Sequence, residues 1–370
     1  MTDKIRIGVF RENLLPYSET FILNQARFIT KYTVEIFGIN RITPETLIKN
    51  TYIFQSMPKI TKTMFKLFSN IPDVWVSSLK DRKYALIHAH FGPDALWASA
   101  FSKKLGIPLV TTFHGYDVFP TQGNLGKMYR YYEFRRRELF SRSSKVIAVS
   151  EYIKSRLLTL GCPEEKIEVH HIGIDTDFFS PIEEVREPII LFVGRLIKQK
   201  GILDLINASS LIKSQNRNPK IVVIGSGNMQ EAAVKLANSK NVSIEFLGKR
   251  SQQEVKEWMN KACILCVPSM YEALGMVYAE AQAMELPVVA YKHGGPPEIV
   301  IDGTSGLLCA PGNIVSLSSA IETLLNDENL RNKMGKSGRN LMVENFNILV
   351  QTQKLEDIYH RVLEEWGCGK

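Results

Sequence analysis

Short apolar runs alternate with amphipathic, helix-like segments along the whole chain. The first half holds six apolar runs: IRIGVF, TVEIFGI, YALIHAH, PLVTTFH, KVIAVS and KIEVHHIG. The second half starts the alternation again with PIILFVGRL, KIVVIGSG, VSIEFLG, CILCVPS, LPVVAY and GLLCA. Such runs, separated by helical patterns, are typical of parallel strands joined by right-handed crossovers. The pattern predicts an α/β fold with two Rossmann-like, doubly wound domains in tandem.

An acidic segment between the two halves is the best candidate for a linker. DTDFFSPIEEVREP begins at Asp175 and is bounded by Pro181 and Pro188, which favour turns and extended chain. A chain of 370 residues also exceeds the length at which one hydrophobic core keeps growing. We expect an N-terminal domain over residues 1–182 and a C-terminal domain over residues 183–345, facing each other across a cleft. Residues 346–370 are expected to form a C-terminal helix that crosses back to the N-terminal domain.

The net charge of +8 lies in the first half. Residues up to Ser180 include 25 Lys and Arg against 17 Asp and Glu, and the rest holds 21 of each. Such a basic surface suits nucleic acid, anionic lipid or a phosphate-bearing acceptor. In KITKTMFKLFSNI, an apolar helical face runs beside Lys59, Lys62 and Lys66. This pattern fits a helix at a membrane surface, and it also fits an ordinary amphipathic helix that covers a core.

Hydropathy and cysteine content indicate in which cellular compartment the protein is expected. No run approaches the ~18 consecutive apolar residues of a membrane span, and MTDKIRIGVF alternates like a first strand rather than a signal peptide. The five cysteines are scattered, which fits reduced thiols. Cys263 and Cys266 have metal-like spacing, but they fall in a predicted strand and would point to opposite faces. We expect a cytoplasmic protein, with peripheral contact at the inner face of the cell membrane left open.

Acidic and basic residues in the second half suggest a ligand with two polyol units. Glu272 and Glu280 follow the apolar run that ends at Val267, and a carboxylate after a strand end can accept hydrogen bonds from two neighbouring hydroxyls. Arg195 and Lys200, in GRLIKQKG, add positive charge after another strand. Two carboxylates and two cations at strand ends together favour a nucleotide sugar, with the cations on its diphosphate.

Two glycine-containing loops belong to the same half. In HGGPPEIV, Gly294 and Gly295 precede a predicted helix start, where backbone N–H groups can approach phosphate. IVVIGSGNMQ contains Gly225 and Gly227 but carries Gln230 where a dinucleotide fingerprint needs a third glycine. An oxidoreductase therefore stays the less favoured alternative.

Polar residues also follow a strand of the first half. FHGYDV places His114, Gly115 and Asp117 at the carboxyl end of the predicted strand PLVTTF, where open α/β sheets bind ligands. His88 and His90, in HAHFG, share one face of the preceding strand. That pair could suggest a metal, but no third ligand is apparent.

The motifs GRLIKQKG, YEALGMVYAEAQA and HGGPPEIV, in this order and spacing, resemble those of glycosyltransferase family 4. This family comprises retaining nucleotide-sugar transferases of the two-domain GT-B fold. The first-half segments PYSETFILNQ, HAHFGPDALWASAFSKKLGIPLVTTFHGYDV and HHIGIDTDFFSP look like the branch that makes bacterial exopolysaccharide, such as colanic acid transferases.

The resemblance implies a role for each matching position. Arg195 and Lys200 match the pair that binds the donor diphosphate. Glu280 matches the glutamate that holds the ribose hydroxyls, and Glu272 matches the one that contacts the donor sugar. His114 matches a histidine that lines the sugar and acceptor side, and with Arg195, Lys200 and Glu272 it completes the expected catalytic set. Further expected positions are Gly194, Gly227, Leu274, Gly275, Gly294 and Gly295 on the donor side and Ser18, Glu19, Thr20, Gly115 and Asp117 on the acceptor side.

The expected reaction is transfer of a sugar, with retention, from a nucleotide diphosphate sugar to a glycan or polyprenyl-diphosphate-linked acceptor in exopolysaccharide or capsule synthesis. UDP is preferred over GDP as the nucleotide. We expect no metal requirement, because Arg195 and Lys200 replace a metal ion on the diphosphate. We also expect no other cofactor and no nucleic-acid partner. Two departures from the family, Leu274 in place of an aromatic residue and Ser-Glu-Thr in place of a glycine-rich loop, affect the sugar and acceptor contacts. A non-catalytic nucleotide-sugar-binding subunit and a transferase with a soluble acceptor remain alternatives.

Overall fold

The structure is a computed structural model. It describes residues 4–14, 19–41, 50–54, 71–119, 127–182, 185–212 and 219–368. The chain forms two compact units, which are described separately: unit 1 comprises Met1–Gly173 and Ile348–Lys370, and unit 2 comprises Ile174–Asn347. None of the helices in these described ranges is long and apolar enough to cross a membrane.

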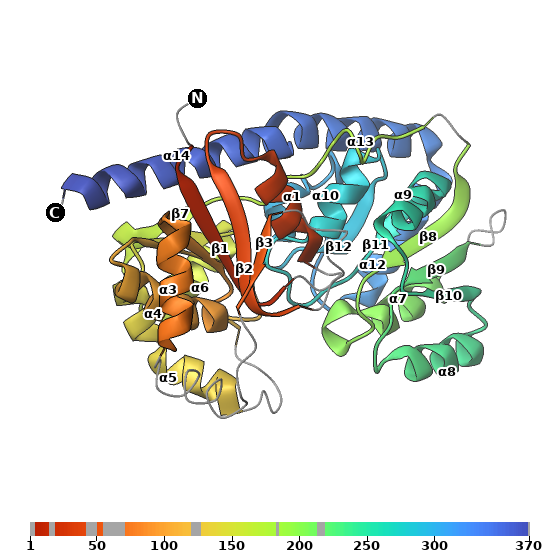
Figure 1. Cartoon of the computed structure of the whole chain (residues 1–370). Coiled ribbons are helices and arrows are strands. Elements are labelled where there is room, and N and C mark those ends of the chain that lie inside the picture. Colours follow the sequence, from red (N-terminus) through yellow and green to blue (C-terminus); the bar gives the residue numbers. More distant parts are fainter. Residues whose placement is uncertain are drawn as a thin grey trace. The chain divides into compact units, whose positions relative to one another are not determined.

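Unit 1 is built on a parallel seven-stranded sheet in the order β3-β2-β1-β4-β5-β6-β7 (Figure 1). The strands are β1 (Arg6–Leu14), β2 (Thr33–Arg41), β3 (Thr51–Ile53), β4 (Tyr84–His90), β5 (Leu109–Phe113), β6 (Lys145–Ala148) and β7 (Ile167–Val169). The helices are α1 (Thr20–Phe28), α3 (Asp73–Arg82), α4 (Gly92–Leu105), α5 (Lys127–Arg142), α6 (Glu151–Thr159), the short η3 (Glu164–Lys166) and α14 (Ile348–Cys368). The direction of strand addition reverses between β1 and β4, and this reversal is the switch point at which open sheets bind ligands.

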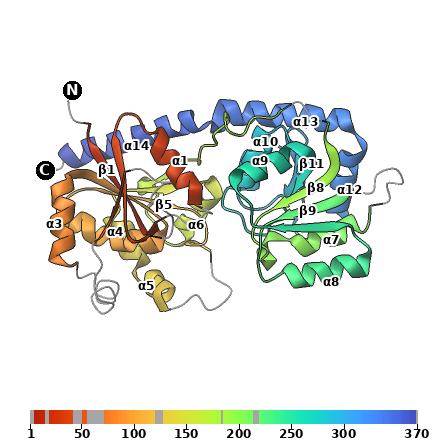
Figure 2. The same cartoon turned by 45° about the vertical axis from the view of Figure 1, so that its right-hand side comes forward.

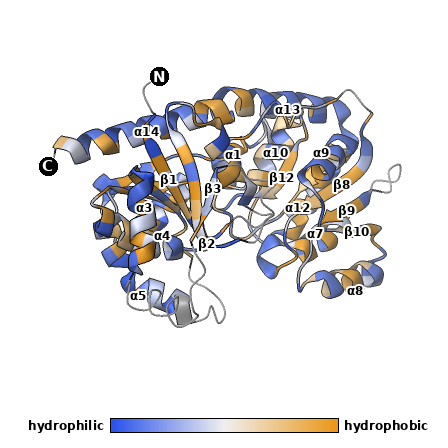
Figure 3. Ribbon diagram, in the orientation of Figure 1, coloured by the Kyte–Doolittle hydropathy of each residue, from blue (hydrophilic) through white to orange (hydrophobic). Residues whose placement is uncertain are grey.

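The strands of unit 1 form because their apolar side chains are covered on both faces of the sheet. All five residues of β5 and the last five of β4 are buried, which explains their almost continuous apolar sequence. Helix α4 is buried from Gly92 to Ser102, apart from Pro93. In Figure 3 α14 alternates between the hydrophobic and hydrophilic colours, as expected for a helix with one buried face.

The C-terminal helix α14 completes the core of unit 1. Its Leu355, Ile358, Tyr359 and Val362 are buried in the same hydrophobic cluster as residues of β1 and β2. The buried Glu356 accepts hydrogen bonds from the backbone N–H groups of Thr30 (2.6 Å) and Lys31 (2.7 Å) just after α1. These contacts join two segments that lie more than 300 residues apart in the sequence.

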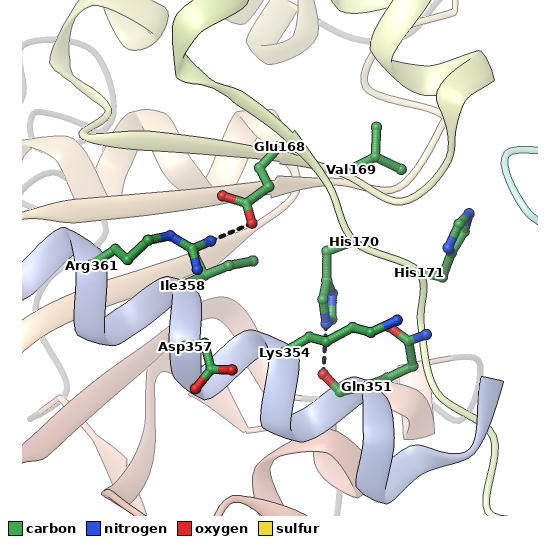
Figure 4. Close-up of a pocket in the computed structure, with 9 residues that line it drawn as sticks. All are labelled: Glu168, Val169, His170, His171, Gln351, Lys354, Asp357, Ile358 and Arg361. Atoms are coloured by element: carbon green, nitrogen blue, oxygen red, sulfur yellow. Dashed lines mark hydrogen bonds and ion pairs between the residues drawn. The ribbon is translucent and has the colours of Figure 1, made fainter. Parts of the chain in front are cut away.

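Polar contacts also fix α14 to the end of β7 (Figure 4). His170 Nε2 hydrogen-bonds the Gln351 carbonyl oxygen over 2.8 Å, and Arg361 forms an ion pair with Glu168. A polar cavity of about 160 Å³ lies beside these contacts.

Unit 2 is built on a parallel six-stranded sheet in the order β10-β9-β8-β11-β12-β13. The strands are β8 (Glu187–Val193), β9 (Lys220–Ile224), β10 (Ile244–Gly248), β11 (Ala262–Cys266), β12 (Val288–Tyr291) and β13 (Gly306–Cys309). The helices are η4 (Lys198–Lys200), α7 (Ile202–Ser209), α8 (Gln230–Lys240), α9 (Gln252–Lys261), α10 (Met276–Ala283), α11 (Pro296–Ile299), α12 (Ile314–Asn326), α13 (Glu328–Leu341) and η5 (Met342–Phe346). Helices α7 and α8 lie on one side of this sheet, and α9 and α10 lie on the other (Figure 2). The predicted α/β class with two doubly wound parallel sheets is confirmed.

The first residues of unit 2 are held by its last helices. The Ile174 N–H donates to the Phe346 carbonyl oxygen (2.7 Å), and Asn347 Nδ2 donates to Thr176 Oγ1 (2.6 Å). Arg339 of α13 donates to the carbonyl oxygen of Phe179 over 3.0 Å. The units therefore divide at Gly173, before the Pro181–Pro188 segment, because these bonds hold residues 174–180 in unit 2.

Candidate active site

The expected donor residues of unit 2 lie around the switch point of its sheet. The strand order reverses between β8 and β11, so the loops after these two strands open at the same edge. The loop after β8 carries Arg195 and Lys200, and the loop after β11 carries Glu272. Glu280 lies on α10, which follows that second loop.

The GRLIKQKG loop is fixed by close backbone contacts. Gly194 N–H donates to the Ile224 carbonyl oxygen over 2.9 Å, which ties the loop to β9. Gly201 has φ +73°, and a Cβ there would lie 2.1 Å from the Pro268 carbonyl oxygen. Only glycine fits this position without displacing the backbone after β11. The loop is thus held against both neighbouring strand ends.

Arg195 and Lys200, the two cations of this loop that were expected to bind the diphosphate, have different surroundings. Lys200 Nζ forms an ion pair with Glu272, and both side chains are about one-sixth exposed. Arg195 is exposed and makes no side-chain hydrogen bond or ion pair with any residue that the structure describes. One cation of the loop is therefore neutralised by the expected sugar-binding glutamate, while the guanidinium is free to bind an anion.

Glu280 is half-buried and has no hydrogen-bond partner within the described part of the chain. Burial raises the pKa of its carboxyl group to about 8. A half-buried acidic group with no cation to stabilise it disfavours folding, and such groups are concentrated at functional sites. Its two oxygens are available to hydrogen-bond donors of a ligand.

The glycines after β12 lock two loops together. Gly295 N–H donates to the Glu272 carbonyl oxygen over 2.9 Å, and a Cβ on Gly295 would lie 2.2 Å from the Ala273 carbonyl oxygen. Gly294 has φ +81° and Gly275 has φ +94°, conformations that favour glycine. These glycines set the position of the Glu272 backbone relative to α10.

Two expected donor positions have a packing role in this structure. The side chain of Leu274 is buried, with 2% exposed. A Cβ on Gly227 would lie 2.2 Å from the Leu196 carbonyl oxygen, so Gly227 lets the loop after β9 pack on the GRLIKQKG loop. This close contact explains why residue 227 is a glycine, so its presence is not evidence for dinucleotide binding.

The expected acceptor residues of unit 1 lie at the carboxyl ends of β1, β4 and β5. Arg11, near the end of β1, is 5% exposed and donates to Asp94 Oδ2 (2.8 Å), to Glu19 Oε2 (2.7 Å) and to the His90 carbonyl oxygen (3.0 Å). A charged network therefore spans the switch point between β1 and β4. Arg11 and Asp94 were not predicted as site residues. Their signal is a charged residue within an apolar strand for Arg11 and an acidic residue in the first turn of an apolar helix for Asp94.

Glu19 and Thr20 lie at the start of α1. Glu19 directs its carboxylate to Arg11, and Thr20 is the first residue of the helix. Burial raises the pKa of the Glu19 carboxyl group, and the Arg11 charge opposes this shift. Ser18 lies outside the residues that the structure describes.

Asp117 is completely buried and organises the loop after β5. Its carboxylate accepts hydrogen bonds from the backbone N–H groups of Gly92 (2.9 Å), Gly115 (2.8 Å) and His114 (3.3 Å). Burial raises its pKa to about 6, although these bonds act in the opposite direction. Gly115 has φ +125°, which lets the chain turn back to meet this carboxylate. The Asp117 carboxylate thus fixes the conformation of the loop that carries His114.

His114 is packed between aromatic rings. Its ring centre lies 4.9 Å from that of Phe21 and 4.5 Å from that of Phe91. Its Nε2 lies 2.9 Å from His90 Nδ1, and the two nitrogens share a hydrogen bond. Burial, reinforced by the nearby Arg11 charge, holds the pKa of His114 well below its ordinary value. The imidazole is therefore neutral at physiological pH.

The structure gives His88 a role other than metal binding. Its Nδ1 bonds the Tyr359 hydroxyl over 2.6 Å, and its Nε2 bonds the Thr112 hydroxyl over 2.7 Å. Both ring nitrogens are thus occupied by protein groups. Across the described ranges, no cluster of three or more His, Cys, Asp or Glu side chains is arranged to hold a metal ion.

One Asp-x-Asp sequence, Asp175–Asp177, occurs in the chain, and Asp175 Oδ1 accepts hydrogen bonds from the N–H groups of Asp177 (3.2 Å) and Phe178 (2.9 Å), so it caps a local turn. Lys59, Lys62 and Lys66 lie outside the described residues.

Comparisons with known proteins show to which family the chain is related. The family model described as "Glycosyl transferases group 1" matches residues 173–341, and that of "Glycosyltransferase Family 4" matches residues 26–178. A glycosyltransferase of Methanocaldococcus jannaschii is 35% identical over 258 residues, which are 69% of each chain. The capsular polysaccharide biosynthesis glycosyltransferase CapM of Staphylococcus aureus is 29% identical over 60% of this chain and 63% of its own length.

A solved structure shares the fold over nearly the whole chain. The Anabaena protein HepE, crystallised in complex with UDP and glucose, aligns with a TM-score of 0.81 at 19% identity and covers 96% of this chain and 100% of its own. The two units thus form a GT-B-like pair of sheets. The chain belongs to glycosyltransferase family 4, whose enzymes take a nucleotide sugar as donor, retain the anomeric configuration and generally need no metal ion.

Proposed function

We propose that this enzyme transfers a sugar from a UDP-sugar to a glycan or polyprenyl-diphosphate-linked glycan in bacterial exopolysaccharide or capsule synthesis. The observation that carries this proposal is the convergence of Arg195, Lys200 and Glu272 at the carboxyl ends of β8 and β11, with Glu280 on the following helix. The capsular function in the name of CapM supports the pathway. The UDP bound to HepE supports the choice of nucleotide.

In this proposal unit 2 binds the donor. Glu280 accepts hydrogen bonds from the two ribose hydroxyls, because its carboxyl group has no partner among the described residues. Arg195 and Lys200 hold the diphosphate. Glu272 then exchanges its ion pair with Lys200 for hydroxyl groups of the donor sugar. The backbones of Gly194, Gly275, Gly294 and Gly295 line the diphosphate and sugar, while Gly227 and Leu274 support the loops behind them.

The chemical step follows from where charge develops. The bond between the anomeric carbon and the phosphate oxygen breaks, so negative charge grows on the diphosphate while the sugar becomes oxocarbenium-like. Arg195 and Lys200 stabilise that charge more strongly in the transition state than in the ground state. In a retaining reaction the acceptor hydroxyl approaches the face of the sugar from which the diphosphate leaves. The leaving phosphate is therefore a suitable acceptor for the proton of that hydroxyl.

Unit 1 is proposed to bind the acceptor. The carboxyl ends of β1, β4 and β5 present His114 and the Glu19–Thr20 helix start at one edge of the sheet. Gly115 and Asp117 shape the loop that carries His114. Ser18 precedes this helix start in the sequence and is proposed to contact the acceptor with Glu19 and Thr20.

The basic first half supports a membrane-linked acceptor. We assign its excess of positive charge to the anionic inner face of the cell membrane, where the cytoplasmic enzyme would meet a polyprenyl diphosphate. Nucleic acid is not part of this assignment.

A panel of nucleotide sugars tests the donor. The chain is heated with UDP-glucose, UDP-galactose, UDP-N-acetylglucosamine, GDP-mannose or ADP-glucose, because a bound ligand raises the midpoint of unfolding by mass action. We expect stabilisation by UDP-sugars and none by the GDP- or ADP-sugars. Stabilisation by GDP-mannose alone would show that the donor nucleotide is GDP rather than UDP. Binding without any transfer or hydrolysis would indicate a non-catalytic subunit.

A further inference from the structure

Three histidines form a row inside unit 1. His88 and His90 lie on β4 with ring centres 4.3 Å apart, and the ring centre of His114 lies 5.2 Å from that of His90. His90 is 2% exposed. The row runs from Tyr359 of α14, which bonds His88, to the loop after β5.

The two ends of this row differ in one respect. Both nitrogens of His88 are bonded to hydroxyl groups, which can donate or accept and so suit either tautomer. His114 has one nitrogen bonded to His90, whereas its Nδ1 is buried and has no partner among the described residues. Buried polar atoms without a partner are rare in native proteins, and each calls for an explanation such as a ligand.

The hydrogen bond between His90 Nδ1 and His114 Nε2 couples the protonation of the two rings. Both imidazoles are neutral, because burial holds their pKa values well below the ordinary value. A single proton lies between the two bonded nitrogens. If it resides on His90 Nδ1, then His114 carries its own proton on Nδ1, and if it resides on His114 Nε2, then His90 carries its proton on Nε2. The two rings must therefore adopt the same tautomer.

We propose that His90 is a positioning residue that fixes the tautomer and ring orientation of His114, so that the orphaned Nδ1 of His114 presents one defined polarity to a hydroxyl group of the bound sugar. The inference rests on the proposed role of His114 at the sugar and acceptor side. Arg11 supports the arrangement by donating to the His90 carbonyl oxygen, and Phe21 and Phe91 hold the other ring. A histidine held in this way can change between donor and acceptor at Nδ1 only if His90 changes its tautomer at the same time.

Side-chain nitrogen NMR of the full-length, ligand-free chain tests the coupling directly. The long-range proton–nitrogen spectrum is recorded with labelled histidine, and variants at each position assign the rings. We expect His90 and His114 to show the same single tautomer. Opposite tautomers in the two rings, or exchange between tautomers in His114, would overturn the proposal.

Three variants separate positioning from folding. His90→Asn places amide atoms near the position of Nδ1 and should keep a single tautomer at His114. His90→Leu removes the partner and should give a mixture. Tyr359→Phe is the matched control, because it removes a buried hydrogen bond from the same row while leaving the His90–His114 bond intact. If Tyr359→Phe alters the His114 tautomer as much as His90→Leu does, the effect is structural and the proposal fails.

Turnover distinguishes this inference from the proposed function. With UDP-glucose as the probe, His90→Leu should lose about tenfold in hydrolysis rate, the scale of one neutral hydrogen bond, and His90→Asn should recover most of it. If His114→Ala hydrolyses UDP-glucose at the wild-type rate, the proposed role of His114 is wrong. If His114→Ala is impaired but His90→Leu keeps both its rate and a single tautomer, only the role of His90 is wrong.

Discussion

At the scale of single residues, the donor site contrasts a paired cation with an unpaired one. Lys200 is bound to Glu272, whereas Arg195 is exposed and free of protein partners within the described residues. In the proposed function, Lys200 exchanges the Glu272 carboxylate for the diphosphate, and Glu272 turns to hydroxyl groups of the donor sugar.

Removing either cation should slow the reaction. We expect Arg195→Ala and Lys200→Ala each to lower the rate of transfer or donor hydrolysis by about 10²-fold, the scale of losing one preorganised charge stabiliser. Lys198→Ala is the matched control, since Lys198 is exposed on the same loop. Wild-type rates in Arg195→Ala and Lys200→Ala would exclude the diphosphate clamp.

Glu280 makes stability depend on pH. Its pKa is raised by burial to about 8 from an ordinary value of 4.5, so between these values the folded chain holds a proton that the unfolded chain has released. The contribution of Glu280 to the free energy of unfolding is therefore most favourable below pH 4.5, declines as the pH rises, and levels off above about pH 8. Thermal unfolding should show Glu280→Gln gaining stability relative to wild type between pH 5 and pH 8. The exposed Glu231→Gln should show no such trend, and a constant difference for Glu280→Gln would contradict the assignment.

At the scale of elements, α14 belongs to the core of unit 1 although it comes last in the sequence. Glu356 accepts two backbone N–H groups after α1, and Tyr359 reaches His88 on β4. The sheet edge that carries His114 therefore depends on a helix that is far from it along the chain.

Glu356→Ala should destabilise unit 1 by about 1–3 kcal/mol, because the N–H groups of Thr30 and Lys31 lose their acceptor in a buried position. Glu356→Gln should recover part of this loss through its amide oxygen. Denaturant unfolding compares both variants with Glu365→Ala, an exposed residue of the same helix. Equal unfolding midpoints for Glu356→Ala and Glu365→Ala would show that the hydrogen bonds from Thr30 and Lys31 to Glu356 do not stabilise unit 1.

The elements with the strongest patterns were predictable from the sequence. Long apolar runs such as PLVTTFH and CILCVPS became β5 and β11, and the motifs placed Glu272 and His114 at the ends of those strands. β3 was not predicted, since a strand of three half-buried residues carries no readable alternation.

The side-chain partners were not predictable. Arg11 and Asp94 form a bond across 83 positions of the sequence, and no local pattern encodes such a contact. The burial of Leu274 likewise depends on tertiary packing rather than on its place in a motif.

At the scale of the whole molecule, the asymmetry of charge leads to a prediction about membranes. Lys59, Lys62 and Lys66 contribute to the +8 excess of the first 180 residues, and each basic residue near an anionic surface adds about 1 kcal/mol. We expect the chain to sediment with anionic liposomes at low salt and to be released at high salt. A triple Lys59, Lys62, Lys66→Glu variant should stay in the supernatant and still hydrolyse donor. Failure of the wild type to sediment at low salt would favour a soluble acceptor.

Calorimetry in the presence of EDTA tests whether unit 2 forms a UDP-sugar site. Wild type, Glu280→Gln and Glu272→Gln are each titrated with UDP and with UDP-glucose. Wild type should bind both ligands without a divalent ion. Glu280→Gln should weaken both by about tenfold, on the scale of one hydrogen bond, whereas Glu272→Gln should weaken only UDP-glucose. Failure of wild type to bind either ligand, or unchanged affinities in both variants, would contradict this account.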